Sequence, residues 1–185
     1  MSVWLQQTYG IRCLGALGFE NTYALAVPEK LADSLHLVSI DDLARFAPEM
    51  TIASDYEFFS RPEWTTLTET YHLRFRETRT MDHSLMYAAV ANGAVQVISA
   101  YSTDGWIADY HLRVLTDPRH AFPPYDAVLL VSPNASDDIR LTQLLAGLAG
   151  TIDADRMRQA NKIVDVDGGT VREAATFLDS IIGAR

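Results

Sequence analysis

Short apolar runs alternate with segments of helical periodicity along the whole chain. Residues 11–19 and 22–27 are apolar runs that end at turn or breaker residues, and they predict two buried strands. Residues 127–131, which follow Pro123 and Pro124, predict another long strand. Because strand-like and helix-like segments follow one another without an internal repeat or a low-complexity linker, the pattern indicates an α/β fold.

The remaining segments fit the same alternation. A helix is expected to begin at Pro28, and Ser39 is placed as the N-cap of the next one. Another helix is expected to begin at Asp82 or His83, with Gly93 at its end. Further strands are expected at residues 50–53, 75–80, 95–101 and 112–115, and further helices at residues 62–72, 106–110, 137–149, 153–164 and 170–182.

The composition is that of an ordinary globular domain, with 48% hydrophobic and 21% charged residues among 185. This length suits one domain or two small lobes that share a core. The formal charge of −9 disfavours nucleic acid and anionic bilayers as partners, because both would be repelled. No apolar run approaches the ~18 residues that span a bilayer, and Cys13, the one cysteine, is expected to be a buried core residue.

The motifs of metal and nucleotide chemistry do not occur in this sequence. The five histidines are scattered, without the HExxH, HxH or Cys/His spacing that directs several ligands to one metal ion. No GxGxxG or Walker-type glycine loop offers a phosphate cradle, and no GxSxG segment offers a serine nucleophile. We therefore expect neither a metal nor a cofactor, and nucleotide enzymes and α/β-hydrolases are disfavoured.

Aromatic residues gather at the ends of predicted strands, in residues 21–23, 57–61, 100–106 and 122–125. In open α/β sheets, ligands bind at the loops that follow the carboxyl ends of the strands, so several of these rings are expected to line one pocket. A tyrosine at a strand end is also commonly a half-buried packing residue, and this remains the alternative for each ring taken singly. Four such segments together favour the pocket.

A pocket lined by tyrosines suits a quaternary ammonium group. Such a cation cannot donate hydrogen bonds, so it must be held by cation–π and dispersion contacts with ring faces. If the ligand also carries a carboxylate, an arginine can bind it through paired hydrogen bonds, and Arg61 is the best-placed candidate. The alternative for Arg61 is a surface ion pair with Glu57 or Glu63, and the residues alone do not separate the two.

Five segments of the chain resemble motifs of one protein family. They are LGFENTYALAV (17–27), SIDDL (39–43), YEFF (56–59) followed by Arg61, AYSTDG (100–105) and FPPY (122–125). In order and spacing they resemble the substrate-binding proteins of osmoprotectant ABC importers, the glycine betaine/carnitine/choline-binding family. The resemblance runs from about Tyr9 through nearly the whole chain, and it implies the type II periplasmic-binding-protein fold.

The resemblance also implies roles for particular residues. Tyr23, Tyr101 and Tyr125 match positions of the family's aromatic cage around a trimethylammonium group, and Asn21 matches a polar residue that borders this cage. Arg61 matches the arginine that binds the ligand carboxylate.

Two nearby carboxylates belong to the same expectation. Asp104, in the loop of Tyr101, is expected either to orient Tyr101 or to face the cation. Glu20 departs from the family, which usually has asparagine beside Asn21. This extra carboxylate either favours a ligand of more positive character or points to solvent.

Family members begin with a further stretch that builds the first half of lobe I, and no such stretch is matched here. The expected organisation is a lobe I strand and hinge at residues 1–27, the complete lobe II at residues 28–125, and the hinge return with the C-terminal helices of lobe I at residues 126–185. With part of the cage absent, we expect this chain to bind betaine weakly or undetectably. Apolar surface of lobe I is expected to drive formation of a homodimer or the exchange of an element.

The function implied by the resemblance is that of a non-enzymatic receptor for small quaternary-ammonium solutes, acting with an ABC transporter permease. Its expected location is extracytoplasmic for the parent protein, periplasmic or membrane-tethered. No signal peptide is expected within this chain. One alternative is a ligand-sensing regulatory domain that reuses the same fold. The other is an enzyme, for which Asp55, Glu57, Asp104 and His83 are available without diagnostic spacing.

Overall fold

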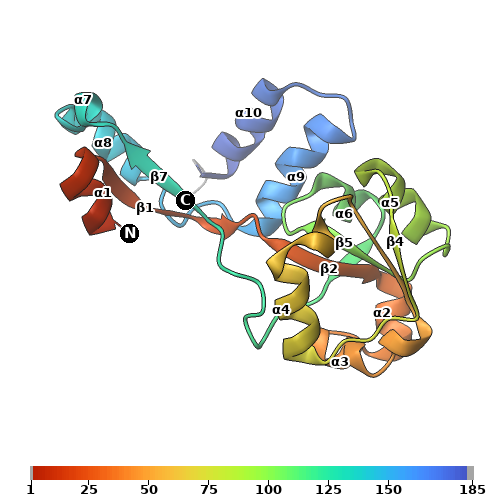
Figure 1. Ribbon diagram of the computed structural model, residues 1–185. Helices are drawn as coiled ribbons and strands as arrows, with labels where there is room; N and C mark the ends of the chain where they lie inside the picture. The colour runs from red at the N-terminus through yellow and green to blue at the C-terminus, as the bar shows by residue number, and fades with distance from the viewer. Residues whose placement is uncertain (1, 183–185) are drawn as a thin grey trace. The chain divides into compact units, whose positions relative to one another are not determined.

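The computed structural model describes residues 2–182 and divides the chain into two compact units (Figure 1). Unit 2 is the continuous segment Thr22–Pro124, and unit 1 consists of Met1–Asn21 together with Tyr125–Arg185. The sequence predicts the first lobe boundary after residue 27, whereas unit 2 begins at Thr22. Residues 1 and 183–185, which belong to the expected lobe ranges, lie outside the described residues.

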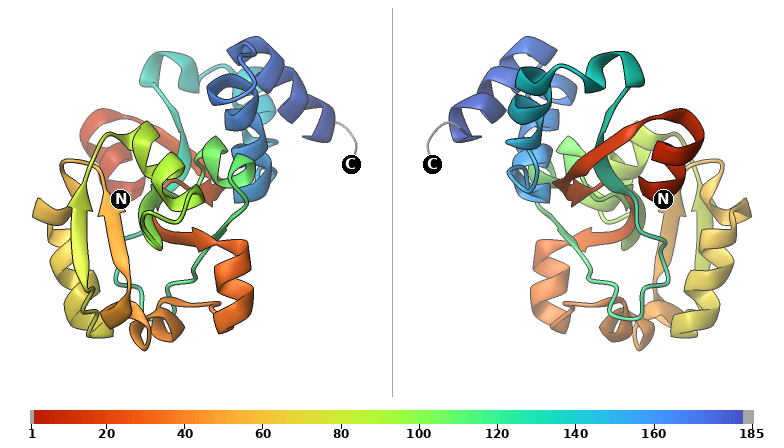
Figure 2. Two further views of the ribbon diagram at one scale, coloured as in Figure 1. Left: turned by 90° about the vertical axis from the view of Figure 1, so that its right-hand side faces the viewer. Right: turned by 90° about the vertical axis from the view of Figure 1, so that its left-hand side faces the viewer.

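Unit 2 is built on a five-stranded sheet of order β4-β3-β5-β2-β6. β3 is parallel to both β4 and β5, whereas β2 is antiparallel to both β5 and β6. In the left-hand view of Figure 2, β3 and β4 run side by side in orange and yellow-green. The strands are β2 (Tyr23–Pro28), β3 (Thr51–Ser54), β4 (Glu77–Thr80), β5 (Val97–Tyr101) and β6 (Leu112–Val114).

The helices of unit 2 begin where the sequence provides caps. The Ser39 side chain accepts a hydrogen bond from the Asp42 N–H at the start of α3, in a reciprocal capping box, and Asp82 accepts one from the Ser84 N–H at the start of α5. The helical elements are α2 (Glu29–Leu35), α3 (Ile40–Ala44), η1 (Ala47–Glu49), η2 (Phe58–Ser60), α4 (Pro62–Tyr71), α5 (His83–Ala91) and α6 (Gly105–Asp109).

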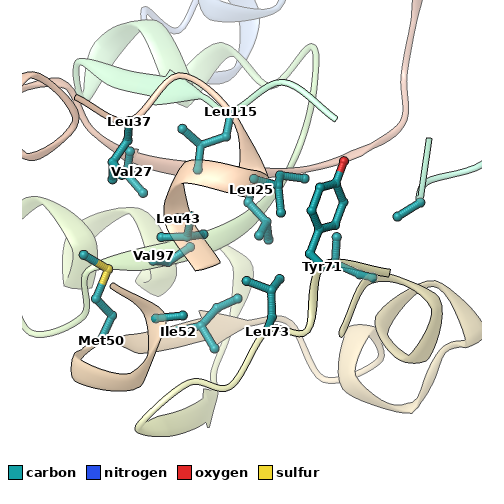
Figure 3. Packing of buried hydrophobic residues seen from close by; sticks show 14 of the residues in the cluster. Leu25, Val27, Leu37, Leu43, Met50, Ile52, Tyr71, Leu73, Val97 and Leu115 are labelled. Atoms are coloured by element: carbon teal, nitrogen blue, oxygen red, sulfur yellow. The ribbon is translucent and has the colours of Figure 1, made fainter. Parts of the chain in front are cut away.

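Apolar side chains cover both faces of this sheet, as the predicted alternation of strands and helices requires. On one face, Leu25, Ile52 and Val97 pack against residues of α2, α3 and α4; Figure 3 shows this cluster. On the other face, Ala26 and Ile98 pack against α5 and α6. Successive residues of a strand point to opposite faces, so a strand such as β2, buried along its length, can supply both clusters.

Unit 1 contains a smaller sheet in which β1 (Arg12–Glu20) pairs antiparallel with β7 (Asp126–Val131). Gly18 has a φ of +118° and lies close to the backbone at Ile152. A Cβ added to Gly18 would be 2.8 Å from the Ile152 carbonyl oxygen. The helices of this unit are α1 (Ser2–Tyr9), α7 (Pro133–Ser136), α8 (Ile139–Ala146), α9 (Ala154–Asp165) and α10 (Val171–Ile182).

Three expectations for unit 1 are wrong: the burial of residues 11–19, the burial of Cys13, and a single helix over residues 137–149. β1 was expected to be buried, but its residues range from half-buried to exposed because its sheet has only two strands, and Cys13 within it is half-buried. The helix expected at residues 137–149 is shorter and follows a separate turn of helix, α7. The pattern also did not predict α1, whose residues show little amphipathic periodicity.

The two ends of unit 2 lie next to each other. The Thr22 hydroxyl donates a hydrogen bond to the Pro123 carbonyl oxygen at 3.2 Å. The Thr22 carbonyl oxygen also accepts a hydrogen bond from the Ser102 N–H at 2.8 Å, which ties this end to the loop after β5.

Candidate functional site

The topology of unit 2 brings several loops to one edge of its sheet. The parallel strands β3, β4 and β5 all end at this edge, and β2, which runs the opposite way, begins there. The carboxyl edge of an open α/β sheet is the usual place for a ligand site. Tyr23 at the start of β2 and Tyr101 at the end of β5 are therefore neighbours, although they are far apart in the sequence.

Tyr23 and Tyr101 form a stacked pair at this edge. They are directly opposite in the β2–β5 register, their ring centroids are 4.9 Å apart, and the planes differ by 29°. The Tyr101 hydroxyl donates a hydrogen bond to the Tyr23 hydroxyl oxygen at 3.2 Å. The side chain of Tyr23 is buried, and burial, followed by the bond to Tyr101, raises the pKa of Tyr23 above the usual tyrosine value.

Phe58 and Phe122 extend this pair into a cluster of four rings, the aromatic cluster. The Phe58 centroid lies 4.9 Å from that of Tyr23, and the Phe122 centroid lies 6.5 Å from it. The Asp55 carboxylate holds the turn before Phe58, because its Oδ1 accepts hydrogen bonds from the N–H groups of Glu57 and Phe58 at 2.8 and 2.9 Å.

A second network holds the segment that carries Phe122. The Tyr71 hydroxyl donates a hydrogen bond to the Asp117 carboxylate and accepts one from the Arg119 N–H at 2.8 Å. The other Asp117 oxygen accepts a hydrogen bond from the Phe122 N–H at 2.8 Å. Burial, together with the bond to Asp117, raises the pKa of Tyr71 to about 12.

Arg61 lies beside the aromatic cluster, at the N-cap of α4. Its guanidinium carbon is 5.5 Å from the Tyr23 ring centroid, within the range of a cation–π contact. Its Nη1 is 3.2 Å from Glu57 Oε2, and its Nε is 3.5 Å from Glu63 Oε2. Arg61 therefore has the ion pairs that the sequence offered as one of its two alternatives, and its guanidinium also lies over a site tyrosine.

A cavity of about 480 Å³ opens on the Arg61 side of the cluster. It lies between the start of α4 and the residues on either side of Phe122. Its lining residues are Arg61, Pro62, Glu63, Thr66, His120, Ala121 and Pro123.

Asp104 links the Tyr101 loop to helix α5. Its Oδ2 accepts a hydrogen bond from the Tyr101 N–H at 3.0 Å and another from the Tyr87 hydroxyl at 2.6 Å. His83 Nε2 lies 3.5 Å from the same oxygen. The hydrogen bond between His83 and Asp104 raises the pKa of the imidazole, and the partial burial of His83 opposes this effect.

The structure brings four of the six expected site residues together in unit 2: Tyr23, Arg61, Tyr101 and Asp104. Asn21 and Tyr125 belong to unit 1, where the Asn21 N–H donates a hydrogen bond to the Tyr125 carbonyl oxygen at 3.1 Å. Tyr125 is 46% exposed.

Sequence reasoning did not assign Phe58, Phe122 or Tyr87 to the site, and it named His83 only as a group available to an enzyme. The first two lie in aromatic segments that were already singled out, so their position was signalled but not their role. Tyr87 and His83 lie on α5, where helical periodicity places core residues, and only the order of the strands brings them to Tyr101.

Within residues 2–182, no group of three or more His, Cys, Asp or Glu side chains is arranged to hold a metal ion. In the same residues, every helix falls short of the length and apolarity that crossing a membrane demands.

Residues 4–178 match a family model described as the substrate binding domain of ABC-type glycine betaine transport systems. The chain is 34% identical over 188 residues to a glycine-betaine-binding protein of Pseudomonas aeruginosa, covering 94% of this chain and 60% of that protein. It is 31% identical over 155 residues to a carnitine transport binding protein of Listeria monocytogenes, covering 80% of this chain and 49% of that protein. The chain therefore spans about half to 60% of the length of these relatives.

The fold has a close counterpart among solved structures. A crystal structure described as a glycine betaine/carnitine/choline ABC transporter superposes with a TM-score of 0.89 at 26% identity, covering 99% of this chain and 67% of that one. The predicted α/β fold of the type II periplasmic-binding-protein class is thereby confirmed. The chain belongs to the family of substrate-binding domains of ABC-type glycine betaine transport systems.

Proposed function

We propose that this chain supplies ligand-binding surface to the solute-binding component of an ABC importer for quaternary-ammonium compatible solutes of the glycine betaine, choline and carnitine type. This role is non-enzymatic. The stacked pair of Tyr23 and Tyr101, with the Arg61 guanidinium 5.5 Å from the Tyr23 ring, is the observation that carries the proposal. The names of the relatives in Pseudomonas and Listeria support the same ligand class.

In this proposal, tyrosine ring faces hold the methylated cation and Arg61 binds the carboxylate. Aromatic faces attract cations through the ring quadrupole, and a guanidinium forms paired hydrogen bonds with a carboxylate. By resemblance to the family, Asn21 and Tyr125 are further candidate ligand-binding residues. Asp104 fixes the Tyr101 loop through the Tyr101 N–H.

We also propose that unit 2 corresponds to lobe II and unit 1 to part of lobe I. The partner is a membrane permease, and the place of action is extracytoplasmic, as for importers of this class. Exposed apolar residues of unit 1, among them Ile139 and Leu144 of α8, support self-association of this chain into a homodimer.

Titration calorimetry of the 185-residue chain with glycine betaine, carnitine and choline tests the ligand class. Because unit 2 carries both stacked tyrosines and Arg61, we expect weak binding and not the undetectable binding that the sequence also allowed, so the ligands are titrated into the millimolar range. Tyr101→Ala should weaken all three ligands by roughly threefold to thirtyfold, because one cation–π contact is lost. Arg61→Gln should weaken glycine betaine and carnitine by roughly tenfold and leave choline, which has no carboxylate, nearly unchanged.

Tyr56→Ala is the matched control, because Tyr56 lies in the loop after β3 and is 73% exposed. This variant should bind as the wild type does. If none of the three ligands binds, the proposed function is wrong. If Tyr101→Ala and Tyr56→Ala have equal effects, the proposed cage is wrong.

A further inference from the structure

His83 is a titratable group on the Tyr101 side of the stacked pair. Its ring centroid lies 6.3 Å from that of Tyr101 and 5.4 Å from that of Tyr87, which it meets edge-on. Its side chain is 39% exposed, so the imidazole can exchange protons with solvent. Arg61, beside Tyr23, is a permanent cation. His83, near Tyr101, is a cation only when its imidazole is protonated.

Acidic groups from three parts of unit 2 surround His83. Asp104, at the N-cap of α6, is the nearest, with Oδ2 at 3.5 Å from Nε2. Asp55, after β3, and Asp82, the N-cap of α5, also stabilise the protonated imidazole. The shared Asp104 oxygen further accepts the hydrogen bonds of Tyr101 and Tyr87, so the imidazole, the carboxylate and the ring pair form one connected arrangement.

The charge next to Tyr101 therefore depends on one proton. When His83 is neutral, the Asp104 carboxylate leaves a net negative charge beside the ring, which attracts a cation held there. When His83 is protonated, the imidazolium cancels this charge. At separations of a few ångströms near a protein surface, such a change alters the binding energy of a cation appreciably.

We infer that His83, acting with Asp104, tunes the attraction of the aromatic cluster for a cationic headgroup, so that affinity for quaternary ammonium ligands falls when His83 is protonated. This inference rests on the proposed function, because it concerns the same site. His83 acts here as a specificity-determining residue for charge and need not touch the ligand.

The direction of the pH dependence follows from the acidic surroundings. Because Asp104 raises the pKa of His83, the imidazolium persists to higher pH than in a free histidine. Affinity for a cation should therefore rise as pH increases through the region above about 6.5, the ordinary histidine pKa. Linkage requires the reverse effect as well: a bound cation must lower the pKa of His83.

The test compares choline with 3,3-dimethylbutan-1-ol, its uncharged analogue, from pH 5.5 to 8.5 in calorimetry with the 185-residue chain. We expect choline to bind roughly threefold to tenfold more tightly at the upper pH, and the alcohol to bind with constant affinity. His83→Gln, which keeps a polar side chain beside Asp104 but cannot titrate in this range, should flatten the choline profile. His72→Asn, at an exposed helix end with φ of +53°, is the control and should keep the wild-type profile.

A second readout separates tuning from a merely structural role. The imidazole resonances of His83, followed by NMR across the same pH range, should titrate at lower pH when choline is present. A choline profile that is equally steep in wild type and His83→Gln overturns this inference and leaves the proposed function intact. Absence of choline and betaine binding at every pH overturns both.

Discussion

The two units bury apolar surface to very different depths. The largest fully buried side chains of the described residues, such as Phe58, Leu25 and Tyr87, all belong to unit 2, whose five-stranded sheet is covered on both faces. Unit 1 buries only a few small or medium apolar residues, and Leu130 of its two-stranded sheet is 49% exposed. An isolated pair of strands has little intrinsic stability, whereas a sheet of several strands that is packed on both faces is stable.

This difference indicates that unit 2 supplies most of the stability and fixes the geometry of the stacked tyrosine pair. The stacked pair of Tyr23 and Tyr101 extends from β2 and β5, two strands that are buried almost throughout. Side chains anchored on such strands keep their geometry without help from mobile loops. Unit 2 should therefore dominate the free energy of unfolding, and unit 1 should dominate association.

The largest expected effect is the contrast between two leucine substitutions. Leu25→Ala removes a fully buried side chain from the unit 2 core and should lower the free energy of unfolding by about 2–5 kcal/mol. Leu130→Ala, in unit 1, removes a half-exposed side chain and should cost less than about 1 kcal/mol. Urea denaturation followed by circular dichroism measures both values. Equal losses would contradict the contrast between the units.

The next effect concerns association. Ile139→Ser combined with Leu144→Ser removes two exposed apolar side chains of α8, 70% and 67% exposed, and should raise the dimer dissociation constant by roughly tenfold or more. Sedimentation velocity over a concentration series measures this constant. Leu85→Ser, at a 57% exposed position of unit 2, is the control and should leave it unchanged. A wild-type chain that stays monomeric throughout would refute the dimer.

A smaller effect is expected where unit 2 holds its Phe122 segment. Tyr71→Phe deletes the hydroxyl that joins Asp117 to the Arg119 N–H, and should cost about 1–2 kcal/mol. Because the folded pKa of Tyr71, about 12, exceeds the unfolded value of about 10, its contribution is complete below pH 10 and is lost as the pH rises toward 12. Denaturation at several alkaline pH values should show a flatter decline for Tyr71→Phe, and parallel curves would contradict this role.

The smallest effect tests the ion pair at the edge of the site. Glu57, whose side chain is 76% exposed, competes with a ligand carboxylate for the Arg61 guanidinium. Glu57→Gln should leave stability nearly unchanged, because exposed ion pairs contribute little. It should tighten glycine betaine binding by roughly twofold and leave choline binding unaffected. Calorimetry with both ligands measures this, and weaker betaine binding would show that Glu57 assists the site instead.

Much of the fold could be predicted because its signals are local. The apolar run that forms β2, the Ser39 cap of α3 and the Asp82 start of α5 are each set by neighbouring residues, and the structure has them where the pattern placed them. The exposure of β1 could not be foreseen from its apolar sequence, since burial depends on which partners cover a strand.

The site was less accessible to sequence reasoning because it is assembled by topology. Tyr23 and Tyr101 face each other only because β2 runs antiparallel to β5, and an alternation of apolar runs does not specify strand direction. The contact of His83 with Asp104 similarly joins the start of one helix to the cap of another. The aromatic segments signalled a ligand site. The sequence left open whether Arg61 binds a ligand carboxylate or pairs with a nearby glutamate, and its contacts became known only from the side-chain geometry.

The hydrogen bond between Thr22 and Pro123 holds the two ends of unit 2 together. A segment whose ends meet can be spliced into a surface loop of an unrelated host without stretching either connection. Tyr23 lies next to one of these ends, whereas Tyr101 and Arg61 lie well inside the segment. A graft of residues 22–124 would thus carry the stacked tyrosines and their neighbouring guanidinium as one transplantable part.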